Sequence, residues 1–84
     1  MEEYLGRVRG LRITAEEYLP PDALTEVDTL IEHGEPAEGV CSLAWALHNA
    51  EVAPPDWMLQ AIQDLTRGIV DRVHMPPSPP ETTS

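Results

Sequence analysis

The stretch DALTEVDTLIEHGEPAEGVCSLAWAL, residues 22–47, contains two helical patterns separated by a turn. In the first pattern, Asp22 suits an N-cap and Gly34 suits the position just after a helix C-terminus. Pro36 then stands where the first residue of another helix is expected. We therefore predict two helices joined by a tight turn. Their apolar faces are Ala23, Leu24, Val27, Leu30 and Ile31 in the first, and Val40, Leu43, Ala44 and Leu47 in the second.

The segments on either side of this stretch show the same helical spacing of apolar residues. Residues 4–19 predict one helix, or two if the chain breaks near Ile13, where Thr14 and Glu17 match a capping box. A last helix is predicted to open at Pro55 and to run to about Val73. No segment alternates with the two-residue period of a strand. The sequence thus predicts an all-α fold, a small antiparallel bundle of four helices, or five with the break.

The chain has 84 residues, which is enough for one domain. We place the helical domain at residues 1–74 and a disordered or polyproline II tail, rich in proline, at residues 75–84. Cys41 is the only cysteine, so no intrachain disulfide forms. The N-terminus lacks a signal-peptide pattern, and no apolar run approaches the length of a membrane span. From these features we expect a cytoplasmic protein.

The charges are strongly one-sided. The chain has no lysine, and residues 13–66 contain neither lysine nor arginine, although eleven carboxylates lie there. The net charge of −10 argues against direct binding to nucleic acid or to an anionic membrane, because both repel it. A basic protein is the partner that this charge favours.

These carboxylates are not equivalent. Asp28 and Glu32 are spaced i, i+4 and repel each other on one helix face. Glu32 and Glu51 also lie near predicted helix C-termini, where the helix dipole disfavours an anion. We therefore take Asp28, Glu32 and Glu51 as the stronger functional candidates, with Glu35 and Glu38 beside them at the Gly34 turn. Asp64 can pair with Arg67. Six of the eleven carboxylates, Glu35 and Glu38 among them, lie at predicted helix starts, which explains their position structurally: Glu16, Glu17, Asp22, Glu35, Glu38 and Asp56.

No motif predicts catalysis. Cys41 and His48 lie two helical turns apart, about 10 Å along the axis, which is too far for a nucleophile and its base. His33, His48 and His74 lack the spacing of a zinc site, and isolated glycines form no phosphate loop. We predict no catalytic residue, no metal site and no cofactor.

Two tryptophans stand beside the apolar faces of their helices. Trp45 and Trp57 either cover the flanks of the bundle or anchor a partner, because tryptophan is enriched among interface hot spots. We favour flank packing and keep Trp45 as the candidate anchor.

The run Leu30-Ile31-Glu32-His33-Gly34-Glu35, with the Ala/Leu-rich helix 40–47 and the proline-started helix 55–69, resembles small helical immunity proteins. These are the MafI-like and contact-dependent growth inhibition kind, and the resemblance covers residues 24–70. Pro36, the proline-rich tail and Gly39, which we expect to interrupt the third helix, depart from that pattern. The resemblance implies a cytoplasmic antidote that binds a toxin, commonly a nuclease domain, and blocks its active site or substrate surface.

Three hypotheses follow. The first is an immunity protein whose acidic face, formed by Asp28, Glu32, Glu35, Glu38 and Glu51 with Trp45, occludes a basic toxin. The second is an acidic DNA mimic or regulatory adaptor. The third is a structural helical module that forms homodimers through Trp45 or Trp57. None of the three needs an enzymatic activity.

Overall fold

The computed structural model describes residues 2–76, and every regular element in this range is helical, which confirms the predicted all-α fold. The α-helices are α1 (Glu2–Ala15), α2 (Thr25–Glu32), α3 (Pro36–Asn49) and α4 (Asp56–Thr66). Two short 3-10 helices, η1 (Pro21–Leu24) and η2 (Arg72–His74), precede α2 and follow α4.

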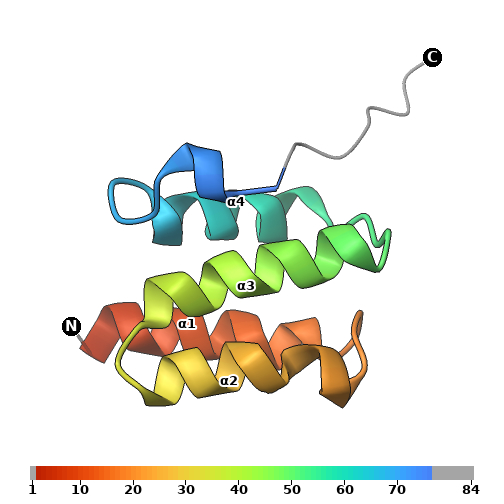
Figure 1. Cartoon of the computed structure of the whole chain (residues 1–84), viewed down its shortest axis with the longest axis horizontal. Helices are drawn as coiled ribbons and strands as arrows, with labels where there is room; N and C mark the ends of the chain where they lie inside the picture. The colour runs from red at the N-terminus through yellow and green to blue at the C-terminus, as the bar shows by residue number, and fades with distance from the viewer. Residues whose placement is uncertain (1, 77–84) are drawn as a thin grey trace.

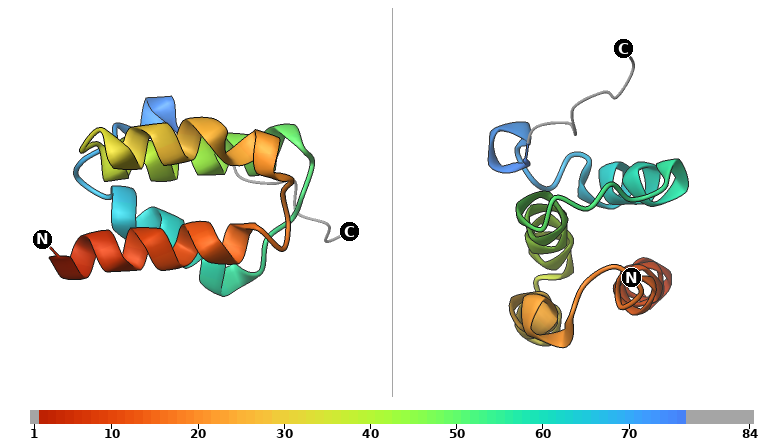
Figure 2. Two further views of the ribbon diagram at one scale, coloured as in Figure 1. Left: turned by 90° about the horizontal axis from the view of Figure 1, so that it is seen from below. Right: turned by 90° about the vertical axis from the view of Figure 1, so that its right-hand side faces the viewer.

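Successive α-helices run in opposite directions, so the connections gather at the two ends of the bundle (Figure 1). The α2–α3 turn lies at the same end as the N-terminus, and we call this the Gly34 end. The other two interhelical connections lie at the opposite end, the Glu51 end. Seen along the bundle, α2 and α3 form one side and α1 and α4 the other (Figure 2). The central helix, α3, packs against each of the other three.

The main core lies between the four helices and contains most of the apolar residues predicted for the faces of α2 and α3, although Leu30 is only half-buried and lies outside it. Leu24, Leu43, Met58 and Leu65 are its largest fully buried side chains. A second, smaller cluster lies on the other flank of α3 and consists of Ala37, Cys41 and Val70. Burial of these side chains supplies the main driving force for folding.

Glycines shape both sides of the α2–α3 turn. Gly34 adopts a φ of +80°, and the N–H groups of Gly34 and Glu35 donate to the carbonyls of Ile31 (3.2 Å) and Leu30 (2.9 Å). This confirms Gly34 as the residue that ends α2. The expectation that Gly39 interrupts the third helix is wrong, because α3 is continuous from Pro36 to Asn49. A Cβ at Gly39 would lie 3.0 Å from Cγ1 of Ile31, so the glycine lets α2 approach closely.

The first helix ends earlier than predicted, and the second begins differently from the prediction. The Thr14 hydroxyl donates to the Gly10 carbonyl inside α1, which is unbroken to Ala15, so the capping box of a separate helix does not form. The predicted cap at Asp22 is also wrong. Pro21 starts the 3-10 turn η1, and no side chain caps either η1 or α2.

The fourth helix ends at Thr66 instead of about Val73. Arg67 and Gly68 (φ +75°) form a type II turn, closed by the Ile69 N–H donating to the Thr66 carbonyl at 3.0 Å. The chain then folds back over α3 (Figure 2). Consequently Val70 is buried in the second cluster, whereas Val73 is 79% exposed.

Met75, which we placed in the tail, is half-buried and packs against both clusters. Pro76, also in the predicted tail, is half-buried, and residues 77–84 lie outside the described residues.

Candidate partner-binding surface

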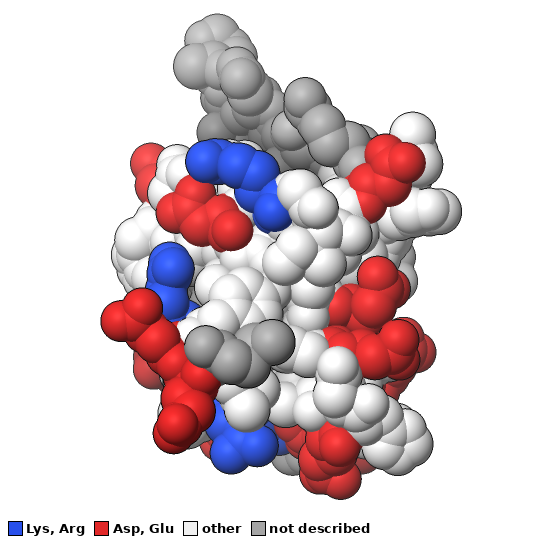
Figure 3. All heavy atoms as spheres, turned by 90° about the vertical axis from the view of Figure 1, so that its left-hand side faces the viewer, with Lys and Arg blue, Asp and Glu red and all other residues white. Residues whose placement is uncertain are grey.

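The helices α2 and α3, which form one side of the bundle, carry carboxylates but neither lysine nor arginine. Figure 3 shows the molecule from the Gly34 end. The charged groups along the side formed by α2 and α3 are acidic, whereas the arginines in this view lie elsewhere. We define the acidic α2–α3 surface as Glu26, Glu32, Glu35 and Glu38, all of them exposed. Within residues 2–76, none of these four takes part in an ion pair.

Two of these residues belong to the start of α3. Glu35 is its N-cap residue and Glu38 lies in its first turn, where unpaired N–H groups and the helix dipole favour negative charge. The dipole stabilises both carboxylates without a cation.

Glu26 lies further along the same surface, near the middle of α3. The Ser42 hydroxyl donates to Oε2 of Glu26 at 3.1 Å and joins α2 to α3 at this point. Glu26 is not among the residues predicted for the site, because a pairing between two helices leaves no mark in the residue spacing along one of them.

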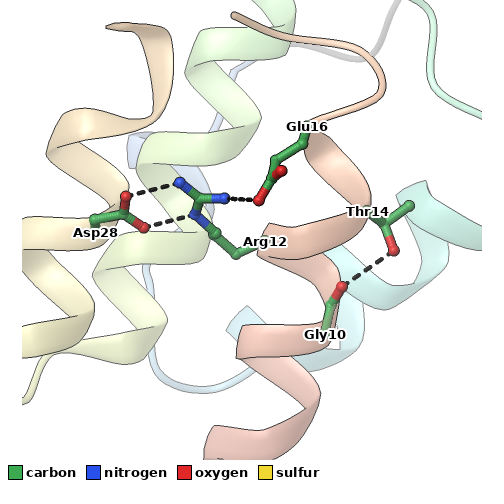
Figure 4. A network of polar contacts seen from close by, with 5 residues as sticks. All are labelled: Gly10, Arg12, Thr14, Glu16 and Asp28. Atoms are coloured by element: carbon green, nitrogen blue, oxygen red, sulfur yellow. Dashed lines mark hydrogen bonds and ion pairs between the residues drawn. The ribbon is translucent and has the colours of Figure 1, made fainter. Parts of the chain in front are cut away.

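Asp28, in contrast, faces α1 and has a cation there. Nε and Nη2 of Arg12 donate to its two carboxylate oxygens at 2.6 and 2.8 Å, and Nη1 of the same guanidinium donates to Glu16 (Figure 4). The hydrogen bonds from Arg12 hold the pKa of Asp28 below its ordinary value, against the opposing effect of burial. The charge that seemed uncompensated in the sequence is thus paired, and Asp28 joins α1 to α2.

Glu51 lies just beyond the C-terminus of α3, at the end of the bundle opposite the Gly34 turn. Since α3 has 14 residues, about 21 Å of helix separates Glu51 from the Gly34 end. Glu51 has a φ of 58°, and its N–H donates to the His48 carbonyl at 3.1 Å in the turn that ends α3. The six predicted residues therefore do not form one patch. Glu32, Glu35 and Glu38 lie near the Gly34 turn, whereas Trp45 and Glu51 lie apart from them. Asp28 is one helical turn from Glu32 on α2 but is paired with Arg12.

Trp45 contacts the C-terminal segment of the described chain. Its Nε1–H donates to the His74 carbonyl at 2.6 Å, and its ring meets that of His48 edge to face at 5.5 Å between centroids. The residue is nevertheless 37% exposed. Trp57, in the first turn of α4, is 55% exposed.

An open depression of about 420 Å³ lies between α1 and α2. Arg12 and Asp28 form part of its wall and are bound to each other, whereas the other two charged residues of the wall, Arg9 and Glu32, have no ion pair in the described residues. The wall thus combines two arginines with two carboxylates, so it presents no charge of one sign to select a ligand. The other lining residues are Arg9, Ile13, Ile31 and Glu32.

Comparisons of the chain with known protein families, with curated proteins and with solved structures find no match. Among residues 2–76, no helix combines the length and the apolar composition that crossing a membrane requires. In the same range, no three His, Cys, Asp or Glu side chains are grouped as metal ligands would be.

Proposed function

We propose that this protein is an immunity protein, which binds a bacterial toxin through the acidic α2–α3 surface and blocks the toxin's basic active site or substrate surface. The observation that carries the proposal is the absence of cations from α2 and α3, together with exposed carboxylates that have no ion pair in the described chain. The resemblance around the Gly34 turn points to the same class of protein.

A nuclease domain is the toxin that fits this surface. Such a domain needs a positively charged cleft to hold phosphates, and carboxylates on α2 and α3 complement that charge. Long-range attraction between the two fields accelerates association, and its effect falls as salt screens the charges. Inhibition occurs by occlusion and requires no chemical step by the immunity protein.

The test is protection of growing cells. The protein encoded by the neighbouring gene is produced alone, then together with this chain. We expect growth arrest in the first case and rescue in the second. The double variant Glu35→Lys/Glu38→Lys should lose the rescue, because it reverses two charges of the acidic surface.

The matched control is Glu3→Lys/Asp56→Lys. It makes the same change in net charge and also places lysines in first helical turns, but on α1 and α4. It should retain the rescue. Equal protection by both double variants would show that the acidic α2–α3 surface is not the binding site. A neighbouring gene for a transcription regulator would favour the adaptor hypothesis instead.

A homodimer is the second candidate, and the exposure of Trp57 favours it. Sedimentation of the purified chain at high concentration tests it. A dimer that Trp57→Ser converts to a monomer would support this candidate, and a monomeric wild-type chain would remove it.

A further inference from the structure

The segment that follows α4 lies across the second apolar cluster of α3. We call residues 67–76 the strap. Its anchor is the carbonyl of His74, which accepts hydrogen bonds from Nε1 of Trp45 at 2.6 Å and from Sγ of Cys41 at 3.4 Å. Both donors project from α3, one helical turn apart. The strap thus contacts Cys41, whose thiol can be alkylated, and Trp45, whose indole is fluorescent.

Few other contacts hold the strap. Among its side chains that the structure describes, Val70 alone is buried, and it packs against Ala37 and Cys41. Met75 adds a half-buried contact to both clusters. The backbone hydrogen bonds recorded for the strap are local: Arg67 donates to Gln63, Ile69 and Val70 donate to Thr66, and His74 donates to Asp71.

The bundle beneath is held differently. Its helices interlock through a continuous core of buried side chains that includes residues from all four of them. Segments with few buried apolar contacts and only local hydrogen bonds open at a lower free energy than the core around them. Opening of the strap therefore disrupts few contacts, whereas opening of the four-helix bundle disrupts the main core.

We propose that the strap opens as a unit while the four-helix bundle stays folded, and that it controls access to Cys41 and to the indole of Trp45. In the closed state Cys41 is buried, with 8% of the residue exposed. Burial raises the pKa of its thiol, and the nearby Glu38 carboxylate adds to the effect. In the open state the stripe Ala37, Cys41 and Trp45 meets solvent beside Glu38. This opening is a property of the free chain and does not rest on the proposed function.

Alkylation of the full chain by N-ethylmaleimide tests the proposal, because Cys41 is its only thiol. The rate is measured at fixed pH and at urea concentrations below the unfolding transition. Local opening exposes little surface, so the rate should depend only weakly on urea. A rate that rises with the urea slope of global unfolding would overturn the proposal, because Cys41 would then react only in the unfolded chain.

Two variants identify the strap as the element that opens. Trp45→Phe keeps an aromatic ring and removes the N–H donor to His74, and it should speed alkylation by about 3- to 10-fold, the effect of one hydrogen bond. Trp57→Phe is the control, since no hydrogen bond links Trp57 to the strap in the described chain. Val70→Ala weakens the strap's apolar contact and should also speed alkylation.

In Trp45→Phe and Val70→Ala, the urea midpoint of global unfolding measured by circular dichroism should stay close to that of the wild type. Two results would show that the strap is not a separate unit. One is an alkylation rate that Trp45→Phe and Val70→Ala leave unchanged. The other is an increase in rate that is fully explained by the loss of global stability that the lower urea midpoint reports.

Discussion

At the level of single residues, Arg12 supplies the cation that α2 lacks. It reaches across from α1, binds Asp28 with two hydrogen bonds and also pairs with Glu16. The spacing of residues along α2 shows that Asp28 and Glu32 repel each other, but it carries no information about which side of α2 meets α1. The pairing could not be predicted because it depends on how the helices pack.

Asp28→Asn should lower the free energy of unfolding at pH 7 by about 0.5–1 kcal/mol, the scale of a partly exposed ion pair. The pKa of Asp28 is lower in the folded state than in the unfolded chain, so its contribution is complete above about pH 4. The contribution is lost as pH falls through the folded pKa. Urea unfolding should show a smaller difference between wild type and variant at pH 3 than at pH 7.

The control for this prediction is Asp64→Asn. Asp64 pairs with Arg67 at 3.3 Å, and the Arg67 side chain is 71% exposed. Its loss should cost less than the loss of Asp28. An equal cost would contradict the structural role assigned to the Arg12–Asp28 pair.

Glu51 has the only left-handed backbone conformation among the non-glycine residues that the structure describes. Glu51→Gly should raise the free energy of unfolding by about 0.5–1 kcal/mol, because glycine adopts positive φ without strain. Glu51→Ala separates this effect from that of the charge, since alanine retains a Cβ. Thermal unfolding of both variants checks the prediction, and equal shifts for Ala and Gly would refute it.

At the level of elements, α2 and α3 could be predicted well, and the end of α4 could not. The α2–α3 turn is encoded locally by Gly34 and Pro36, which suit the end of one helix and the start of the next. The apolar spacing that extends to Val73 instead fits two arrangements. Val70 has the position of a buried helical residue, yet it is buried by a chain that has turned back at Gly68. Periodicity alone cannot distinguish these arrangements.

Substitution by alanine should have opposite effects at two glycines, because Gly39 lies where α2 and α3 pack closely and Gly10 lies at an open position of α1. Gly39→Ala should lower the free energy of unfolding by about 1–3 kcal/mol, the usual range for overpacking. Its Cβ would meet Cγ1 of Ile31 at 3.0 Å and the Val27 carbonyl at 3.3 Å, and backbone cannot move aside easily. Gly10→Ala in α1 should raise it by about 0.5–1 kcal/mol, because the site is open and helical.

Urea unfolding of the two alanine variants gives the answer. Stabilisation by Gly39→Ala would mean that α2 and α3 are not held at the distance seen here.

At the level of the whole molecule, the charge that distinguishes the sequence is arranged unevenly. Arginines lie on α1 and in the strap, whereas α2 and α3 have none. The excess of negative charge could be predicted from the sequence, and so could its concentration near the Gly34 turn. The separation of Glu51 from that turn could not, because it follows from the direction in which α3 runs.

Self-repulsion of this charge predicts that salt stabilises the fold. The melting temperature should rise as sodium chloride is added, because screening weakens repulsion between carboxylates. Glu3→Lys/Asp56→Lys brings the net charge from −10 to −6, since each reversal changes it by two units, and should reduce the rise. A melting temperature independent of salt in both proteins would show that repulsion is already balanced within the fold.

The most direct test of the proposed function is the affinity of the chain for the neighbouring gene's product, measured by calorimetry at several salt concentrations. We predict binding by the wild type that weakens as salt increases, retention of this binding in Glu3→Lys/Asp56→Lys, and its loss in Glu35→Lys/Glu38→Lys. Absence of binding by the wild type, or equal affinity and salt dependence in all three proteins, would contradict a role for the acidic α2–α3 surface.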